Sequence, residues 1–155
     1  MAAMGGINQL TTGKLISLFE QALVDYDTSD DQGCEGDLMD NACEFIINND
    51  SQTTETIYPY RVDGTCNAMI EAVCVAKITG YEDVPANSES ALLKIVANQP
   101  VSVSINAGEF DFQFYSGGTF TEQCRTDLDL GLQLGTWTRE DRTKYWPVKN
   151  SWGTE

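Results

Sequence analysis

Five cysteines are the most reactive side chains of this 155-residue chain, which contains no histidine to activate them. A cysteine attacks a carbonyl as its thiolate, which a neighbouring imidazole usually generates near neutral pH. Without histidine, the only base near neutrality is a carboxylate with a raised pKa. The spacing also lacks the C-x-x-C pattern of zinc sites, although a tetrathiolate from scattered cysteines stays open. Thiol catalysis is therefore not predicted from these cysteines, which are Cys34, Cys43, Cys66, Cys74 and Cys124.

An acidic segment, DYDTSDD from residue 25, invites comparison with a calcium-binding loop. An EF-hand loop needs glycine at its sixth position and a bidentate glutamate at its twelfth. Here the sixth position is Asp30 and the twelfth is Gly36. The pattern favours a solvated loop, and we expect neither a metal site nor a cofactor.

The excess of acidic over basic residues excludes some classes of function. Acidic residues outnumber basic ones 24 to 9, which gives a formal net charge of −15. Such a chain repels nucleic acids and anionic lipids, so partners of those kinds are not expected. No apolar run approaches the roughly 20 residues that a membrane-spanning helix requires, and the first residues do not resemble a signal peptide. The acidity suits an acidic compartment, and it equally suits plain solubility.

Patterning predicts helices in the first half and strands in the second. Ser17 and Glu20 form a capping box before one helix, and Leu38, Ala42, Phe45 and Ile46 share one face of another. Residues 73–84 alternate like a strand, and residues 88–99 resemble a helix that is capped at Ser88 or Ser90. Three strands follow, at 100–107, 110–120 and 144–152. This order predicts an α+β protein with a helical domain at 1–76 and a β-rich domain at 77–155.

Six ordered segments carry a resemblance that covers nearly the whole chain. They are GKLISLFEQALVDYD, GCEGDLMDNA, YPYRVDGTC, YEDVPANSESALLKIVANQPVSVSI, DFQFYSGGTF and KYWPVKNSWGTE. Together they resemble a papain-type cysteine endopeptidase of the plant kind. The resemblance implies a two-domain fold, with a helical half and a β-barrel-like half, and an active site in the cleft between them. It also implies that the chain is incomplete at both ends.

The resemblance assigns catalytic positions residue by residue. Asn150 matches the asparagine that orients the family's imidazole, and Trp152 matches the tryptophan that shields this contact. The histidine of the family's D-H-G step should follow Asp129, where this chain has Leu130. The nucleophilic cysteine, about 130–150 residues before the asparagine, should lie upstream of Met1. We therefore expect the chain as written to be inactive.

The same resemblance assigns substrate-binding residues. The GCEG turn pairs with an extended peptide through its backbone, and Asp37 stands where the family usually has another glycine. The residue before the histidine position also contacts substrate in the family. Ordinary core packing is the alternative for the three apolar members. The expected substrate-binding set is Gly36, Asp37, Leu38, Met39, Ser104, Leu128 and Asp129.

The disulfides that the resemblance implies and one glycosylation pattern are both features of proteins that enter the secretory route. By the resemblance, Cys34 should pair with a cysteine before Met1, Cys66 with the position that Tyr26 holds, and Cys124 with a cysteine beyond Glu155. We therefore expect all three family disulfides to be absent, and the isolated chain to be marginally stable, because each bridge contributes about 2–4 kcal/mol. Asn49 begins Asn-Asp-Ser, which fits the N-glycosylation pattern.

Three hypotheses for function follow. The first is a partial cysteine endopeptidase, monomeric, acting on peptides or proteins in a vacuole, a lysosome-like compartment or outside the cell. The second is a pseudoprotease that binds peptides or a protease partner without hydrolysis, and a storage or allergen-like role is a weaker third. The segment GLQLG departs from the family's G-V-T-A-V-G. Codons that can encode Val-Thr-Ala (GTT-ACA-GCT-G), read one base later, give Leu-Gln-Leu, as in Leu132, Gln133 and Leu134. We hypothesise that a short frameshift removed the histidine.

Overall fold

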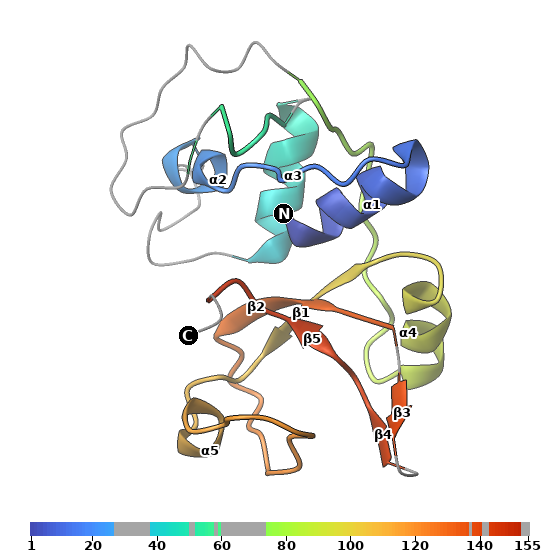
Figure 1. Ribbon diagram of the computed structural model, residues 1–155, viewed down its shortest axis with the longest axis vertical. Helices are drawn as coiled ribbons and strands as arrows, with labels where there is room; N and C mark the ends of the chain where they lie inside the picture. The colour runs from blue at the N-terminus through green and yellow to red at the C-terminus, as the bar shows by residue number, and fades with distance from the viewer. Residues whose placement is uncertain are drawn as a thin grey trace. The chain divides into compact units, whose positions relative to one another are not determined.

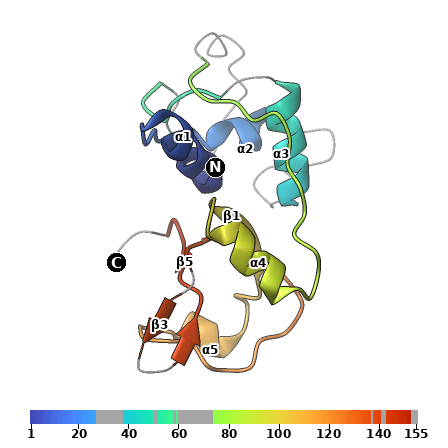
Figure 2. The same ribbon diagram turned by 90° about the vertical axis from the view of Figure 1, so that its right-hand side faces the viewer.

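The computed structural model describes residues 1–26, 38–49, 52–57, 59, 74–136, 138–140 and 143–152. The chain divides into two compact units, Met1–Val84 and Pro85–Glu155 (Figures 1 and 2). The domain boundary expected between residues 76 and 77 lies within the first unit. Among the described residues, three helices lie in the first unit and all named strands lie in the second, so the α+β class is confirmed.

The first unit contains α1 (Ala2–Thr12), α2 (Gln21–Tyr26) and α3 (Met39–Asn48). Helix α1 ends at Gly13, whose left-handed backbone (φ 75°) lets its N–H donate to the Gln9 carbonyl. The core of this unit joins residues that are far apart in sequence. It consists of Met4, Leu18, Ile46 and Ala76, with Met1, Ile16, Leu23, Phe45, Val75 and Ile78 packed around it.

The predicted start of α2 is wrong because a tertiary contact holds the residues before it. Leu18 forms an isolated antiparallel bridge with Thr54, and the Phe19 N–H donates to the Thr53 carbonyl at 3.3 Å. A backbone paired this way cannot also enter a helix. Ser17 therefore does not cap α2, and its hydroxyl lies 3.4 Å from a carboxylate oxygen of Glu55.

Two further expectations for this unit need correction. The strand predicted at 73–84 is, over the described residues 74–84, a single bridge between Gln52 and Ala76. Helix α3 forms as predicted, but only part of the proposed face is buried: Ile46 is 2% exposed, whereas Leu38, the residue before the helix, is 70% exposed. Leu38 therefore does not serve as a core residue of this unit.

The second unit combines two helices with five strands. They are α4 (Glu89–Val96), β1 (Val101–Ile105), α5 (Phe110–Gln113), β2 (Leu130–Leu134), β3 (Thr138–Glu140), β4 (Thr143–Tyr145) and β5 (Val148–Lys149). Ser88, one of the two caps predicted for α4, is the N-cap of this helix, since its side chain accepts from the Ala91 N–H at 3.4 Å. Strand β2 pairs with β1 on one side and β5 on the other, and β3 and β4 form a separate two-stranded sheet. Figure 1 shows this hairpin apart from the other strands.

The central strand of this sheet is β2. It pairs antiparallel with β1, with Leu130 opposite Ile105 and Leu134 opposite Val101. It also pairs with β5, with Gln133 opposite Lys149. Leu132 and Leu134 are 6% and 5% exposed, which matches the alternation of a half-buried strand. The segment that departs from the family pattern thus forms the middle of the sheet.

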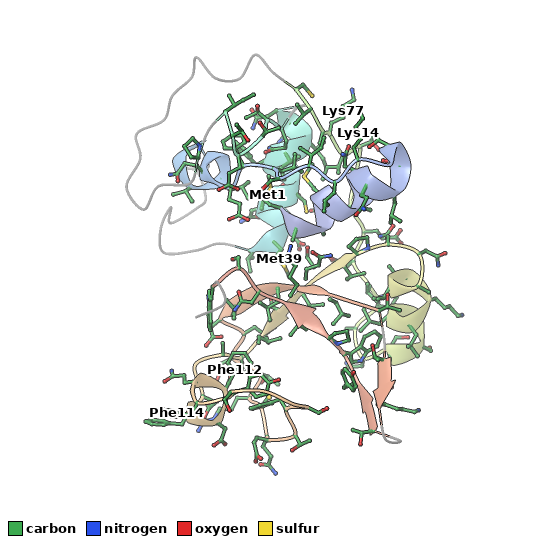
Figure 3. All side chains as sticks on the ribbon, in the orientation of Figure 1. Met1, Lys14, Met39, Lys77, Phe112 and Phe114 are labelled. Carbon is green, nitrogen blue, oxygen red and sulfur yellow. The ribbon has the colours of Figure 1, made fainter. Side chains whose placement is uncertain are left out.

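The strand predicted at 110–120 is wrong. Residues 110–113 form the short helix α5, followed by a loop. Aromatic content misled the prediction, because here the rings pack on one another rather than across strands. Phe112 and Tyr115 both contact Phe120 edge-on, at 5.7 and 5.8 Å between ring centroids. Phe114, labelled in Figure 3, is 74% exposed and stacks on Phe110.

The last predicted strand, at 144–152, forms in two pieces. Strand β4 ends at Tyr145 and β5 begins at Val148, so that Pro147 lies between them. Proline lacks the N–H that a continuous ladder requires. Its carbonyl still takes part, since it accepts from the Gly135 N–H at 2.7 Å.

Candidate functional site

Several expected site residues of the second unit lie at one end of its sheet. The strands β1 and β2 are antiparallel, as are β2 and β5, so β1 and β5 end where β2 begins. Ser104 lies near the end of β1, Leu130 opens β2, and Asn150 follows β5. Extending the β2–β5 register by one residue sets Asn150 opposite Leu132. The topology therefore gathers residues that are up to 46 positions apart.

Leu130 occupies the position where the family resemblance expects a histidine. Its side chain is half-buried, and its backbone pairs with Ile105 of β1. The residue before it is also fixed, because the Asp129 N–H donates to the Ile105 carbonyl at 3.0 Å. An aliphatic side chain here can neither remove a proton nor form an ion pair with a thiolate.

Asp129 holds the loop that leaves β1. One oxygen of its carboxylate accepts from the Ala107 N–H at 2.6 Å, and the other accepts from the Gly108 N–H at 2.8 Å. We call this pair of hydrogen bonds the Asp129 clamp. Gly108 fits beside it because it has no side chain: a Cβ there would lie 2.7 Å from the Asp129 carboxylate oxygen. The clamp therefore ties the start of β2 to the end of β1.

Asn106, next to the clamp, was not anticipated from the sequence. Its side chain is buried, and its amide nitrogen donates to the Asp127 carbonyl at 2.6 Å. Its amide oxygen has no hydrogen-bond partner among the described residues. The residues around Asn106 show no sequence pattern that predicts its burial. The burial depends on the contact with Asp127, which lies 21 residues further along the chain.

Asn150 and Trp152 are both exposed in the second unit. The Asn150 amide oxygen accepts from the Ser151 N–H at 2.7 Å. Trp152 is 69% exposed, and Leu128 is 62% exposed. Ser104 is half-buried and lies opposite Gly131. The exposure of Leu128 is inconsistent with core packing, which was the alternative explanation for this leucine.

The expected site residues of the first unit are only partly described. Gly36, Asp37, Cys34 and Cys66 lie outside the described residues, as does most of the acidic segment at 25–31. Leu38 is exposed, and Met39 begins α3 (Figure 3). Met39 and Leu38 therefore stand together at the start of one helix.

The described thiols differ in environment. Cys43, on α3, is half-buried, and burial raises its pKa above the usual range for a thiol. Cys124 is exposed, and neither thiol forms a disulfide within the described ranges. A raised pKa lowers the fraction of reactive thiolate, so Cys43 is a weaker nucleophile than a solvated cysteine.

The described ranges hold no group of three Cys, Asp or Glu side chains that is arranged to bind a metal ion. None of their helices has the length and apolar character needed to cross a membrane.

Comparison with known proteins decides the family. The model of the papain family of cysteine proteases matches residues 1–155. The chain belongs to this family. The resemblance carried by the six sequence segments is thereby confirmed.

Plant thiol proteases are prominent among its relatives. The chain is 57% identical over 157 residues to Senescence-specific cysteine protease SAG39 of Oryza sativa, covering 99% of this chain and 46% of that protein. It is also 57% identical to Vignain of Ricinus communis, covering 100% of this chain and 44% of that protein. The chain thus spans less than half the length of these curated relatives.

Solved structures support the papain-like fold. The bromelain protease from Ananas comosus, in complex with the E64 inhibitor, matches with a TM-score of 0.90 and 36% identity. That match covers 98% of this chain and 70% of bromelain. The proform of the ragweed pollen allergen Amb a 11, a cysteine protease, matches with a TM-score of 0.91 and 38% identity, covering 97% and 42% of the two chains.

Proposed function

We propose that this chain is part of a cysteine endopeptidase that hydrolyses peptide bonds through a Cys-His-Asn site in its intact form. The observation that carries the proposal is the family match over all 155 residues. The arrangement in the second unit supports it, because the topology brings position 130 and Asn150 to the same end of one sheet. Peptides or proteins are the proposed substrates, and the proposed state is a monomer.

In the intact enzyme, a cysteine thiolate attacks the peptide carbonyl and expels the amine, and water then hydrolyses the thioester. The proposed roles of residues in this chain are supportive. Asn150 would orient an imidazole at position 130, and Trp152 would shield that contact. The Asp129 clamp would hold position 130 by fixing the residue before it. Gly36, Asp37, Leu38, Met39, Ser104, Leu128 and Asp129 are proposed to contact substrate.

We further propose that the 155 residues as written do not hydrolyse peptide bonds. The chain contains no histidine, and Leu130 stands at the base position. Cys43 is a poor substitute nucleophile, because burial raises its pKa. Cys124 is exposed, but no imidazole is available to activate it.

A hybrid protein tests both parts of the proposal. The matched segment of the rice relative is replaced by this chain, so that the remaining residues come from an intact protease. We expect no hydrolysis of a peptide substrate by the hybrid, and recovery of hydrolysis when Leu130→His is introduced. Leu128→His is the matched control, since it adds a histidine two residues away at an exposed leucine. Full activity of the unaltered hybrid would contradict the proposed inactivity, and a folded Leu130→His hybrid without activity would contradict the assignment of position 130.

A pseudoprotease is the second candidate. It is favoured by the regular pairing of β2 around Leu130, since the chain forms the sheet end without a histidine. This function predicts that the hybrid binds an extended peptide without cleaving it, and fluorescence polarisation of a labelled peptide measures the binding. Absence of both binding and cleavage would exclude this candidate.

The proposed compartment is the vacuole, a lysosome-like compartment or the extracellular space. One relative, 53% identical over 156 residues, is the KDEL-tailed cysteine endopeptidase CEP2 of Arabidopsis thaliana. The net charge of −15 agrees with an acidic compartment, where carboxylates near their pKa values are partly neutralised. Fractionation of plant cells expressing the tagged protein would test this assignment.

A further inference from the structure

The tripeptide Asn49-Asp50-Ser51 is the only match to Asn-x-Ser/Thr in the chain. Asn49 is the residue that ends α3, where it follows the last helical residue, Asn48. Both asparagines are exposed, whereas Ile46 in the preceding turn is buried in the core. The acceptor side chain therefore lies on the solvent side of the helix end, where a bulky group displaces no core residue.

The hydrogen bonds of Asn49 are compatible with a modified amide. Its backbone N–H and its side-chain nitrogen both donate to the Phe45 carbonyl, each at 3.0 Å. A primary amide has two N–H bonds, and an N-glycosidic link replaces one of them. The other N–H remains able to donate to Phe45. The modification does not involve the backbone N–H of Asn49. The hydrogen bond from this N–H to the Phe45 carbonyl at the end of α3 therefore remains with or without the sugar.

We propose that Asn49 is a site of N-linked glycosylation. The donor is an oligosaccharide linked to a lipid pyrophosphate. In the transfer, a bond forms between Asn49 Nδ2 and the anomeric carbon of the sugar, and the bond from that carbon to the pyrophosphate oxygen breaks. The pyrophosphate leaves with the electron pair, and Nδ2 loses one proton. The site rests on the secretory route included in the proposed function, since the donor is present only there.

The test is translation of the full 155-residue chain behind a cleavable secretory leader, with microsomes present. We expect one discrete decrease in gel mobility that endoglycosidase H reverses. Asn49→Gln and Ser51→Ala should each abolish the shift. Ser51→Thr should retain it, because threonine preserves the acceptor pattern, and Asn48→Gln should retain it as the matched control one residue outside the pattern.

Loss of the shift in Asn48→Gln, or its persistence in Asn49→Gln, would overturn the assignment to Asn49. A mobility unchanged by microsomes, while a control glycoprotein shifts, would overturn the proposal altogether. The leader delivers the chain to the microsomes irrespective of its natural compartment or activity. Failure here is therefore distinguishable from failure of the proposed endopeptidase function.

Discussion

The Asp129 clamp leads to a prediction about two residues that are far apart in sequence. Asp129→Ala removes the acceptor for the Ala107 and Gly108 N–H groups. A hydrogen bond to a charged group contributes about 1.5–3 kcal/mol, and the exposure of Asp129 to solvent reduces that value. We expect the two bonds together to contribute about 1–3 kcal/mol, measured in the free energy of unfolding or of local opening.

Gly108→Ala should break the same clamp by a steric route. Its added Cβ would lie 2.7 Å from the Asp129 carboxylate oxygen, which can move away only by giving up its hydrogen bonds. In the Asp129→Ala background this contact no longer exists. The two substitutions should therefore be non-additive, with a coupling energy of about 1 kcal/mol or more.

Amide hydrogen exchange measured by NMR gives the local readout, because it follows the Ala107 and Gly108 amide protons individually. Asp129→Ala should reduce the protection of both by about tenfold for each 1.4 kcal/mol lost. Urea unfolding gives the global value for the same four proteins. If Gly108→Ala costs the same free energy in both backgrounds, the clamp does not link these residues and the reasoning is refuted.

Three further predictions concern single positions. Leu132→Ala should lower the free energy of unfolding by about 2–4 kcal/mol in urea titrations, because Leu132 is 6% exposed. Leu128→Ala should change it by less than about 0.5 kcal/mol, because Leu128 is 62% exposed. Equal losses would contradict the description of the sheet. The hydrogen bond to Glu44, aided by desolvation, raises the pKa of Tyr81 to about 12. The folded protein favours the neutral phenol, so the Tyr81–Glu44 hydrogen bond stabilises the fold fully below about pH 10. This stabilisation is lost as the pH rises through about 12. Ultraviolet titration of Glu44→Gln should show tyrosine ionisation shifted to lower pH, and an unchanged titration would disprove the contact. Ser88→Ala should destabilise the protein by about 0.5–2 kcal/mol through loss of the α4 cap, and Ser88→Thr should preserve most of that stability.

Local patterns predicted the elements whose interactions are themselves local. Helix α4 has a serine cap and apolar residues at helical spacing, and it forms where expected. Strand β1 was predicted from its β-branched residues. By contrast, Ser17 and Glu20 fit a capping box, yet Leu18 pairs with Thr54 and the helix begins only at Gln21. A bridge between segments separated by 36 residues leaves no trace in either segment alone.

The candidate site divides in the same way. Motif resemblance assigned site roles to positions 130 and 150, since each lies within a recognisable segment, and these roles stay predictions. The contacts of Asp129 with Ala107 and Gly108 and the burial of Asn106 were not predictable. They depend on the pairing of β1 with β2, which closes a loop of 24 residues between Ile105 and Leu130. The sequence therefore allowed a prediction of which positions belong to the site, whereas the hydrogen bonds that hold position 129 and the burial of Asn106 depend on strand pairing that no local pattern shows.

The pH dependence of thiol alkylation in the rice hybrid tests the central claim most directly. Iodoacetamide modifies the thiolate, and mass spectrometry distinguishes the hybrid's catalytic cysteine from the others. With Leu130, that cysteine has no imidazole partner, so we predict alkylation that rises around the ordinary thiol pKa of about 8.5. With Leu130→His, an ion pair should form, and alkylation at about pH 6 should be roughly 100-fold faster. Equal alkylation rates at that pH in both proteins would show that position 130 is not where the base belongs, and would contradict the account.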